Sequence, residues 1–229
     1  MSRTFTVETK PYDDVRIFNR KNIEIQPGIT ILVGCNGAGK TTLIHAMQHE
    51  LKKNNIEYLN YDNLQDGGNH SVSKAMFYND TELAASMICS SEGETITLNI
   101  VNIVENIVYY LKHGKTKRTA LDTALDNLIE NKVNEKKEET VSQERWIFFD
   151  AVDSGLSIDN VLDFKEFVLD PIIKNNSNLY VIISANSFEM ASGEQCLDVY
   201  NGQYCTFDNY EEYKKFICKT RERKEKRYK

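Results

Sequence analysis

The chain has 229 residues, of which 41% are apolar and 27% charged, an ordinary composition for a soluble globular protein with one sizeable core. Its net charge of −6 argues against a general affinity for nucleic acid, and no apolar run approaches the roughly 20 residues that cross a bilayer. The five cysteines lack zinc spacing and the N-terminus lacks a secretory signal, so we expect one domain over residues 1–229, with reduced thiols, in the cytoplasm.

The first thirty residues contain two runs with strand character. β-Branched and aromatic residues partly alternate in "TFTVET" and "VRIFNRKNIEI", which Pro11 interrupts and Pro27 ends. We expect these runs to form an antiparallel N-terminal edge of the sheet. "ITILVG" (29–34) is continuously apolar, which is typical of a buried central strand. A glycine-rich turn then leads to a helix whose apolar face comprises Leu43, Ile44, Met47 and Leu51.

The middle of the chain predicts one strand, one long helix and two polar segments. "IEYLNY" (56–61) predicts the strand, and the turn-rich sequence after it, to about residue 90, predicts a loop with a short helix. From Glu94 onward the spacing predicts an amphipathic helix. Its apolar positions are Ile100, Ile103, Val104, Ile107, Val108 and Leu111. Residues 113–143 are polar and predict an insert with one helix and an exposed charged stretch.

The C-terminal third again alternates strands and helices. "WIFFD" (146–150) and "LYVIIS" (179–184) predict buried strands, with a helix over 157–170 between them, capped by Ser157 and stopped before Pro171. "CLDVYNGQYCTF" predicts a hairpin that turns at Asn201–Gly202, and a helix follows over 209–229. Alternating strands and helices predict an α/β fold with a mainly parallel central sheet and flanking helices.

The last eleven residues form a basic tail, with seven Lys or Arg against two Glu. We interpret this tail, residues 219–229, as a solvated and frayed helix end, because charge runs are usually exposed surface. Contact with phosphates is the alternative.

"GCNGAGKTT" (34–42) fits the pattern G-x-x-x-x-G-K-[ST] and lies between a strand and a helix, the context that this pattern requires. Glycines let successive backbone N–H groups turn inward around an anion, and the helix N-terminus adds partial positive charge. We expect Lys40 to reach the terminal phosphates of a nucleotide and Thr41 to bind Mg²⁺. The predicted nucleotide-binding residues of this loop are Asn36, Gly37, Ala38, Gly39, Lys40, Thr41 and Thr42. A glycine-rich turn that only connects strand and helix is the alternative.

The form G-x-N-G-x-G-K-T-T-L in this stretch resembles the phosphate loop of ABC-type ATPases, including the RecF and SMC branch, in which two heads sandwich ATP. The resemblance covers nearly the whole chain in motif order. It implies a P-loop NTPase fold of ABC-ATPase type, ATP and Mg²⁺ as cofactors, and a homodimer. "SSEGE" (90–94) is similar to the family's signature motif, which implies that Ser91 and Gly93 meet the γ-phosphate bound to the opposite subunit. Glu92 departs from that motif, and an ordinary helix cap is the alternative.

"FFDAVDSGLS" (148–157) resembles the family's second motif, which implies that Asp150 is the Mg²⁺ carboxylate at the end of a buried strand. The resemblance further suggests Gln65 as the glutamine that senses Mg²⁺, with a plain turn as the alternative. Two family residues are replaced: the catalytic glutamate by Ala151 and the switch histidine by Asn186. Asparagine can donate a hydrogen bond to a γ-phosphate but cannot take up a proton.

Asp153 is a candidate carboxylate for the attacking water, and a helix-capping or dimer-contact role is its alternative. General-base residues contribute about 10² to 10⁴ in rate, so we expect slow ATP hydrolysis. A non-hydrolytic, ATP-gated interaction module is one alternative, with a protein or nucleic-acid partner, and a RecF-like DNA repair accessory ATPase is another. A further explanation for Ala151 is that it was engineered in place of a glutamate in order to trap ATP. Tyr12 or Phe18 is a candidate to stack on the base, with core packing favoured for Phe18.

Overall fold

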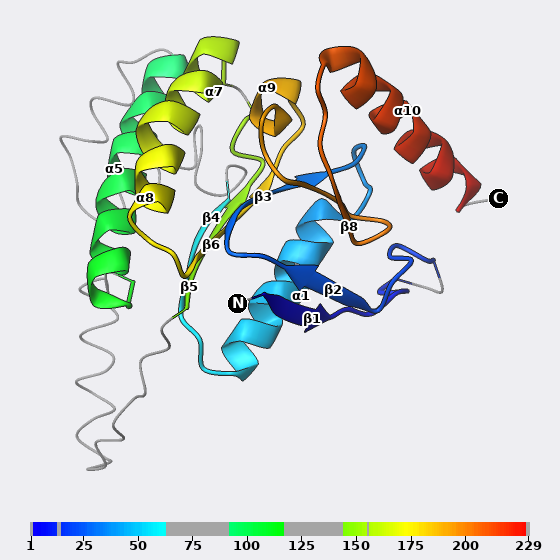
Figure 1. Cartoon of the computed structure of the whole chain (residues 1–229), viewed down its shortest axis with the longest axis horizontal. Helices are drawn as coiled ribbons and strands as arrows, with labels where there is room; N and C mark the ends of the chain where they lie inside the picture. The colour runs from blue at the N-terminus through cyan, green and yellow to red at the C-terminus, as the bar shows by residue number, and fades with distance from the viewer. Residues whose placement is uncertain (1, 13–14, 63–91, 117–143, 155, 228–229) are drawn as a thin grey trace.

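The computed structural model describes residues 2–12, 15–62, 92–116, 144–154 and 156–227, without the side chains of 92–102. Six of its strands form one sheet in the order β4, β5, β6, β3, β7, β8 (Figure 1). Their bounds, in that order, are Tyr58–Asp62, Arg145–Asp150, Leu179–Ser184, Gly28–Val33, Cys196–Asp198 and Gln203–Cys205. Neighbouring strands from β4 to β7 pair in parallel, whereas β8 is antiparallel to β7. The predicted α/β fold with a mainly parallel sheet is confirmed.

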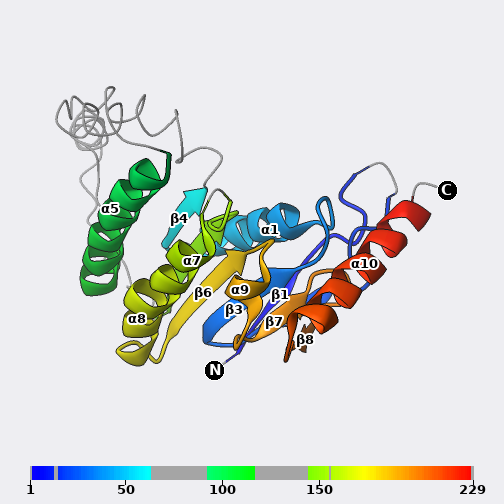
Figure 2. The same ribbon diagram turned by 90° about the horizontal axis from the view of Figure 1, so that it is seen from above.

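Helices cover both faces of this sheet (Figure 2). α1 (Lys40–Lys53) packs on one face, and α5 (Glu92–His113), α7 (Ile158–Phe164) and α9 (Phe188–Ala191) pack on the other. Successive residues of a strand point to opposite faces, so each central strand supplies both cores. In β5, for example, Phe149 lies in the core under α5 and α7, whereas Phe148 lies in the core under α1.

The two N-terminal strands pair as predicted, but their predicted place at the edge of the central sheet is wrong. β1 (Arg3–Thr6) and β2 (Asn22–Ile25) form a separate antiparallel sheet of two strands. Their inward side chains join the core under α1, where the rings of Phe5 and Trp146 meet edge to face with centroids 5.2 Å apart. These strands therefore bury a face against the central sheet, and its antiparallel edge strand is β8.

The helical segment after β5 begins where predicted but does not stop before Pro171. Ser157 caps α7, its Oγ accepting a hydrogen bond from the backbone N–H of Asn160 at 3.3 Å. A π-helical turn, η1 (Lys165–Leu169), follows, and α8 (Asp170–Lys174) continues the run with Pro171 in its first turn. Proline has no backbone N–H to donate, so Pro171 removes one hydrogen bond from this run without ending it. The predicted end of the helix before this proline is therefore wrong.

Helix α5 matches the predicted amphipathic helix, although its buried face differs in part from the predicted apolar positions. Ile103 and Ile107 are buried as expected, but Val108 is 57% exposed. Tyr110, which was not among the predicted apolar positions, is buried in the core. Its hydroxyl donates to the Glu57 carbonyl at 2.8 Å and accepts from the Trp146 N–H at 3.0 Å. The polar atom of this buried ring is thus satisfied by the residue before β4 and by β5.

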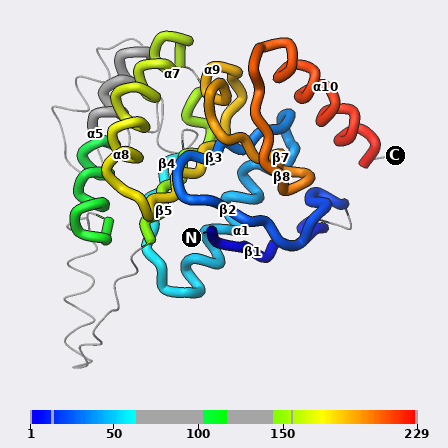
Figure 3. The backbone as a smooth tube through the Cα atoms, viewed as in Figure 1, coloured from blue at the N-terminus to red at the C-terminus, as the bar shows by residue number. Residues whose placement is uncertain are grey.

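The C-terminal helix α10 (Tyr210–Lys226) begins where predicted, with Asn209 as its N-cap, and extends through most of the basic tail. Figure 3 traces the chain from β8 into α10, which lies on the same side of the molecule as β7 and β8. The expectation of a frayed end is wrong, because residues 219–226 are helical, whereas the expected exposure holds for one face of the tail. Arg223 pairs with the buried Asp198 at 3.2 Å, and Arg227 donates to the Ile17 carbonyl at 3.2 Å. These contacts hold the tail against the body of the protein.

Candidate functional site

The loop that joins β3 to α1 is shaped by glycines with left-handed backbone angles. Gly39, the N-cap of α1, has φ 109°, and a Cβ built on it would lie 2.5 Å from Cγ2 of Ile17. A larger residue at this position would be strained and would collide with its neighbour. Since the N-cap residue has no side-chain oxygen, it leaves the first N–H groups of α1 available to another acceptor. This arrangement suits an anion at the start of the helix.

Lys40, the first residue of α1, folds back into this loop. Its side chain is only 9% exposed, and Nζ donates to the Gly34 carbonyl at 2.8 Å and lies 3.5 Å from the Cys35 carbonyl. Burial lowers the pKa of Lys40, while the nearby Cys35, Asp153 and Asp150 act in the opposite direction. The ammonium is therefore enclosed by the loop, within electrostatic reach of Asp150 at the end of β5 and Asp153 after it.

Asp150 ends β5 and is 6% exposed. Its Oδ1 accepts a hydrogen bond from Oγ of Ser184, the last residue of the neighbouring strand β6. The same serine oxygen accepts from the backbone N–H of Ala151 at 2.8 Å. The carboxyl ends of parallel strands meet at one edge of a sheet, the usual place for a binding site in this fold class. Ser184 therefore holds the predicted metal-binding carboxylate and the turn after it.

Ala151 occupies the position directly after Asp150 with φ 53°, in the left-handed region. This conformation costs a residue with a Cβ about 1–2 kcal/mol relative to the right-handed one. Alanine carries the smallest such side chain. Glycine, which has no Cβ, would adopt this conformation without that cost.

Asp153 joins the segments that follow β5 and β6. Its Oδ2 accepts from the backbone N–H groups of Asn186 and Ser187, each at 2.7 Å. Its Oδ1 is buried and has no hydrogen-bond partner among the described residues. One oxygen of Asp153 therefore holds the segment after β6, and the other has no donor among the described residues.

Asn186 also contacts the C-terminal helix through its backbone. Its carbonyl accepts from the hydroxyl of Tyr213 at 3.0 Å, and burial, with a smaller contribution from Asp153, raises the pKa of that tyrosine. The Asn186 residue itself is exposed. Its backbone is thus fixed on both sides, whereas its side chain lies at the surface near Asp153.

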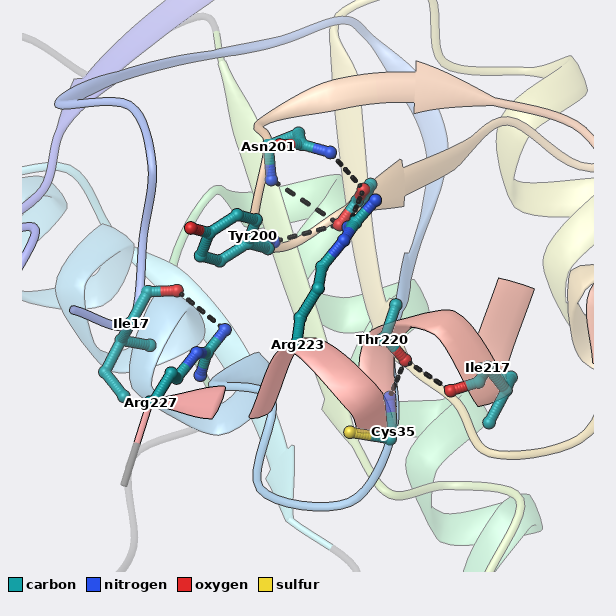
Figure 4. Close-up of polar contacts among 9 residues, drawn as sticks. Ile17, Cys35, Tyr200, Asn201, Ile217, Thr220, Arg223 and Arg227 are labelled. Carbon is teal, nitrogen blue, oxygen red and sulfur yellow. Dashed lines mark hydrogen bonds and ion pairs between the residues drawn. The ribbon is translucent and has the colours of Figure 1, made fainter. Parts of the chain in front are cut away.

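Helix α10 supplies site contacts that the sequence did not predict. The backbone N–H of Cys35, inside the loop of residues 34–42, donates to Oγ1 of Thr220 at 3.0 Å (Figure 4). Lys224 Nζ donates to the carbonyl of Asn36 in the same loop at 2.9 Å. Neither residue belongs to a recognisable motif, because the tail reads only as a charge run. By contrast, a polar residue such as Ser184 at the end of an apolar strand is a usable signal.

Several predicted residues lie elsewhere or outside the described part of the chain. Gln65 and Ser91 are outside the described residues, and Gly93 lies in the first turn of α5, whose side chains are likewise outside the description. Phe18 is 1% exposed, consistent with core packing. Tyr12 is 57% exposed, with its hydroxyl 3.4 Å from Oγ1 of Thr42, so its stacking on a base stays a prediction.

The described residues contain no group of three or more His, Cys, Asp or Glu side chains that could form a metal site of their own. Among the same residues, no helix is both long and apolar enough to cross a membrane. No protein-family model matches the chain, and no curated protein matches it significantly.

Proposed function

We propose that the chain is an ABC-type ATPase that binds Mg·ATP at the loop of residues 34–42. The observation that carries this proposal is the position of Lys40. Its buried ammonium is enclosed by a glycine-rich loop at the start of α1 and lies within electrostatic reach of Asp150 and Asp153. A buried cation with no ion-pair partner among the described residues is costly unless it has an anionic ligand, and phosphate suits both the cation and the loop.

Each part of the site has a role in this proposal. The loop N–H groups and Lys40 bind the phosphates, and Asp150 and the Thr41 hydroxyl are the residues that would hold Mg²⁺. Mg²⁺, when bound, neutralises charge on the phosphates. Ser184 keeps the Asp150 carboxylate in place through its hydrogen bond. The residues thus fit an ion shared between protein and nucleotide.

Asp153 is the residue that we assign to the attacking water, through Oδ1. This oxygen is buried and free of partners among the described residues, while Oδ2 is held by two backbone N–H groups. A carboxylate fixed by one oxygen can accept a proton or orient water with the other. Because Ala151 provides no acid–base group and Asn186 cannot take up a proton, hydrolysis is slow.

A non-hydrolytic, ATP-gated interaction module is the second candidate. It is favoured by Ala151 and by the hydrogen bonds that already occupy one oxygen of Asp153. In either case the family resemblance implies an ATP-sandwiched homodimer in which Ser91 and Gly93 face the partner's phosphates. A nucleic-acid partner has less support, since Arg223 and Arg227 of the basic tail contact the chain itself.

Steady-state phosphate release with Mg·ATP separates the two candidates. The ATPase is supported by slow turnover that Lys40→Ala abolishes and Lys53→Ala leaves unchanged. Lys53 is the control because it lies exposed at the other end of α1. Binding of ATP without turnover above background supports the module. Light scattering after size-exclusion chromatography, with and without ATP, tests the homodimer: a mass that stays monomeric with saturating ATP contradicts it.

A further inference from the structure

The C-terminal helix α10 is attached to the phosphate loop and its surroundings by side chains on successive turns. Thr220 accepts from the Cys35 N–H, Arg223 pairs with Asp198, and Arg227 donates to the Ile17 carbonyl (Figure 4). Thr220 is 5% exposed and Asp198 6%. Arg227 also lies with its guanidinium carbon 5.0 Å from the ring centroid of Tyr200. These contacts come from three separate segments, so the helix has a defined position beside the loop.

This position places Lys224 directly over the loop. Its Nζ donates to the Asn36 carbonyl at 2.9 Å, and a Cβ built on Gly37 would lie 2.8 Å from the same nitrogen. Only a glycine at position 37 leaves room for this ammonium without displacement. The exposed surface of Asn36 and Gly37 therefore carries a cation that comes from the far end of the chain.

Two ammonium groups thus meet three consecutive carbonyls of the loop. Lys40 contacts those of Gly34 and Cys35, and Lys224 contacts that of Asn36. Other basic residues of the tail have acidic partners, such as Arg221 with Glu225 at 3.2 Å. Lys224 has no carboxylate partner within the part of the chain that the structure describes. A neutral carbonyl is a weaker partner for an ammonium than a phosphate oxygen.

We propose that Lys224 is a second phosphate-binding cation, which contacts the outermost phosphate of a nucleoside triphosphate at the proposed site. This inference rests on the proposed function. The N–H groups near the start of α1 surround the inner phosphates, and Asn36 and Gly37 lie earlier in the loop, away from that helix start. A cation over these two residues is therefore placed for the terminal phosphate. The C-terminal helix then distinguishes triphosphate from diphosphate.

The test compares the affinities of Lys224→Gln and wild-type protein for Mg·ATP and Mg·ADP by isothermal titration calorimetry. Glutamine can still donate to the Asn36 carbonyl but has no charge, so the substitution separates the charge from the hydrogen bond. We expect the affinity for ATP to fall about tenfold, which is the loss expected for one half-buried charge-assisted hydrogen bond. The affinity for ADP should change less than about twofold, because ADP lacks the outermost phosphate. Lys219→Gln, on the exposed side of the same helix, should bind both nucleotides like the wild type.

Lys224→Arg keeps the charge and should keep the preference for ATP over ADP. Equal losses for ATP and ADP in Lys224→Gln would assign a purely structural role to the residue and overturn the proposal. Unchanged binding, or tighter binding of both nucleotides, would overturn it as well. Wild-type protein that binds neither nucleotide would contradict the proposed function itself, whereas wild-type binding that depends on Lys40 but not on Lys224 would contradict only this inference.

Discussion

Substitution of Ser184 by alanine should destabilise the protein and loosen the proposed metal-binding carboxylate. Its hydroxyl donates to Asp150 and accepts from the Ala151 N–H at 2.8 Å, and the residue is 2% exposed. Alanine fills the same backbone position but makes neither bond. A buried carboxylate oxygen then loses its donor and a backbone N–H loses its acceptor.

The expected cost follows from these two groups. A hydrogen bond to a charged group contributes about 1.5–3 kcal/mol, and an unpaired N–H costs about 1–3 kcal/mol. Ala151 is only partly buried and water can reach some of the turn, so we expect the sum to lie near the low end, about 3 kcal/mol. For a chain of this size that corresponds to a melting temperature lower by roughly 10 °C.

Ser187 provides a matched control three residues along the chain. Its Oγ is also buried but has no hydrogen-bond partner among the described residues, so Ser187→Ala removes an unpaired polar group and should leave stability unchanged or raise it. Urea unfolding followed by circular dichroism measures both variants. Comparable losses in the two proteins, or a loss below about 1 kcal/mol in Ser184→Ala, would refute the reasoning about the Asp150 contact.

Three further predictions concern the core and the turn after β5. Burial raises the pKa of Tyr110 to about 12, so its contribution to stability is complete below pH 10 and is lost as the pH rises towards 12. Tyr110→Phe should therefore be less stable than wild type at neutral pH, with the gap in unfolding free energy narrowing above pH 10; a gap independent of pH would contradict this. Ala151→Gly should raise the unfolding free energy by about 0.5 kcal/mol and Ala151→Val lower it by about 1–2 kcal/mol, because of the left-handed backbone. Asp153→Asn keeps an oxygen for the two N–H groups, so ATP affinity should persist while phosphate release falls about 100-fold, and an unchanged rate would exclude Asp153 as the base.

Local patterns predicted the fold well where one physical rule dominated. The continuous apolar runs became the buried strands β3, β5 and β6, because strands covered on both faces have no polar side to show. The side-chain oxygen of Ser157 predicts a helix cap, and the structure confirms it. The predicted order of strands and helices was therefore reliable in the described parts of the chain.

Features that depend on distant segments were missed. The separate sheet of β1 and β2 packs on the central sheet through contacts such as Phe5 on Trp146, which lie far apart in the sequence. The tail is expected to fray because its composition carries no information about its partners, which are Asp198 and the loop of residues 34–42. Pro171 was interpreted as a helix stop because the π turn before it has no sequence signature.

The candidate site was predictable as a set of motifs but not as a set of contacts. The loop of residues 34–42 follows β3 and Asp150 ends β5 at the same edge of the sheet, so their proximity could be inferred. The contacts of Asp153 could not be inferred, since they depend on the backbone after β6. Asp62 was also overlooked, although it lies in register with Asp150 on the neighbouring strand.

Equilibrium binding of a fluorescent ATP analogue in the presence of Mg²⁺ tests the central claim most directly. The wild-type chain and Lys53→Ala should bind it with the same affinity and release it when unlabelled ATP is added. Lys40→Ala should lose at least about 100-fold in affinity, because the buried cation of the loop is gone. Wild-type protein that does not bind the analogue, or Lys40→Ala protein that binds it equally well, would contradict the assignment of a nucleotide site to this loop.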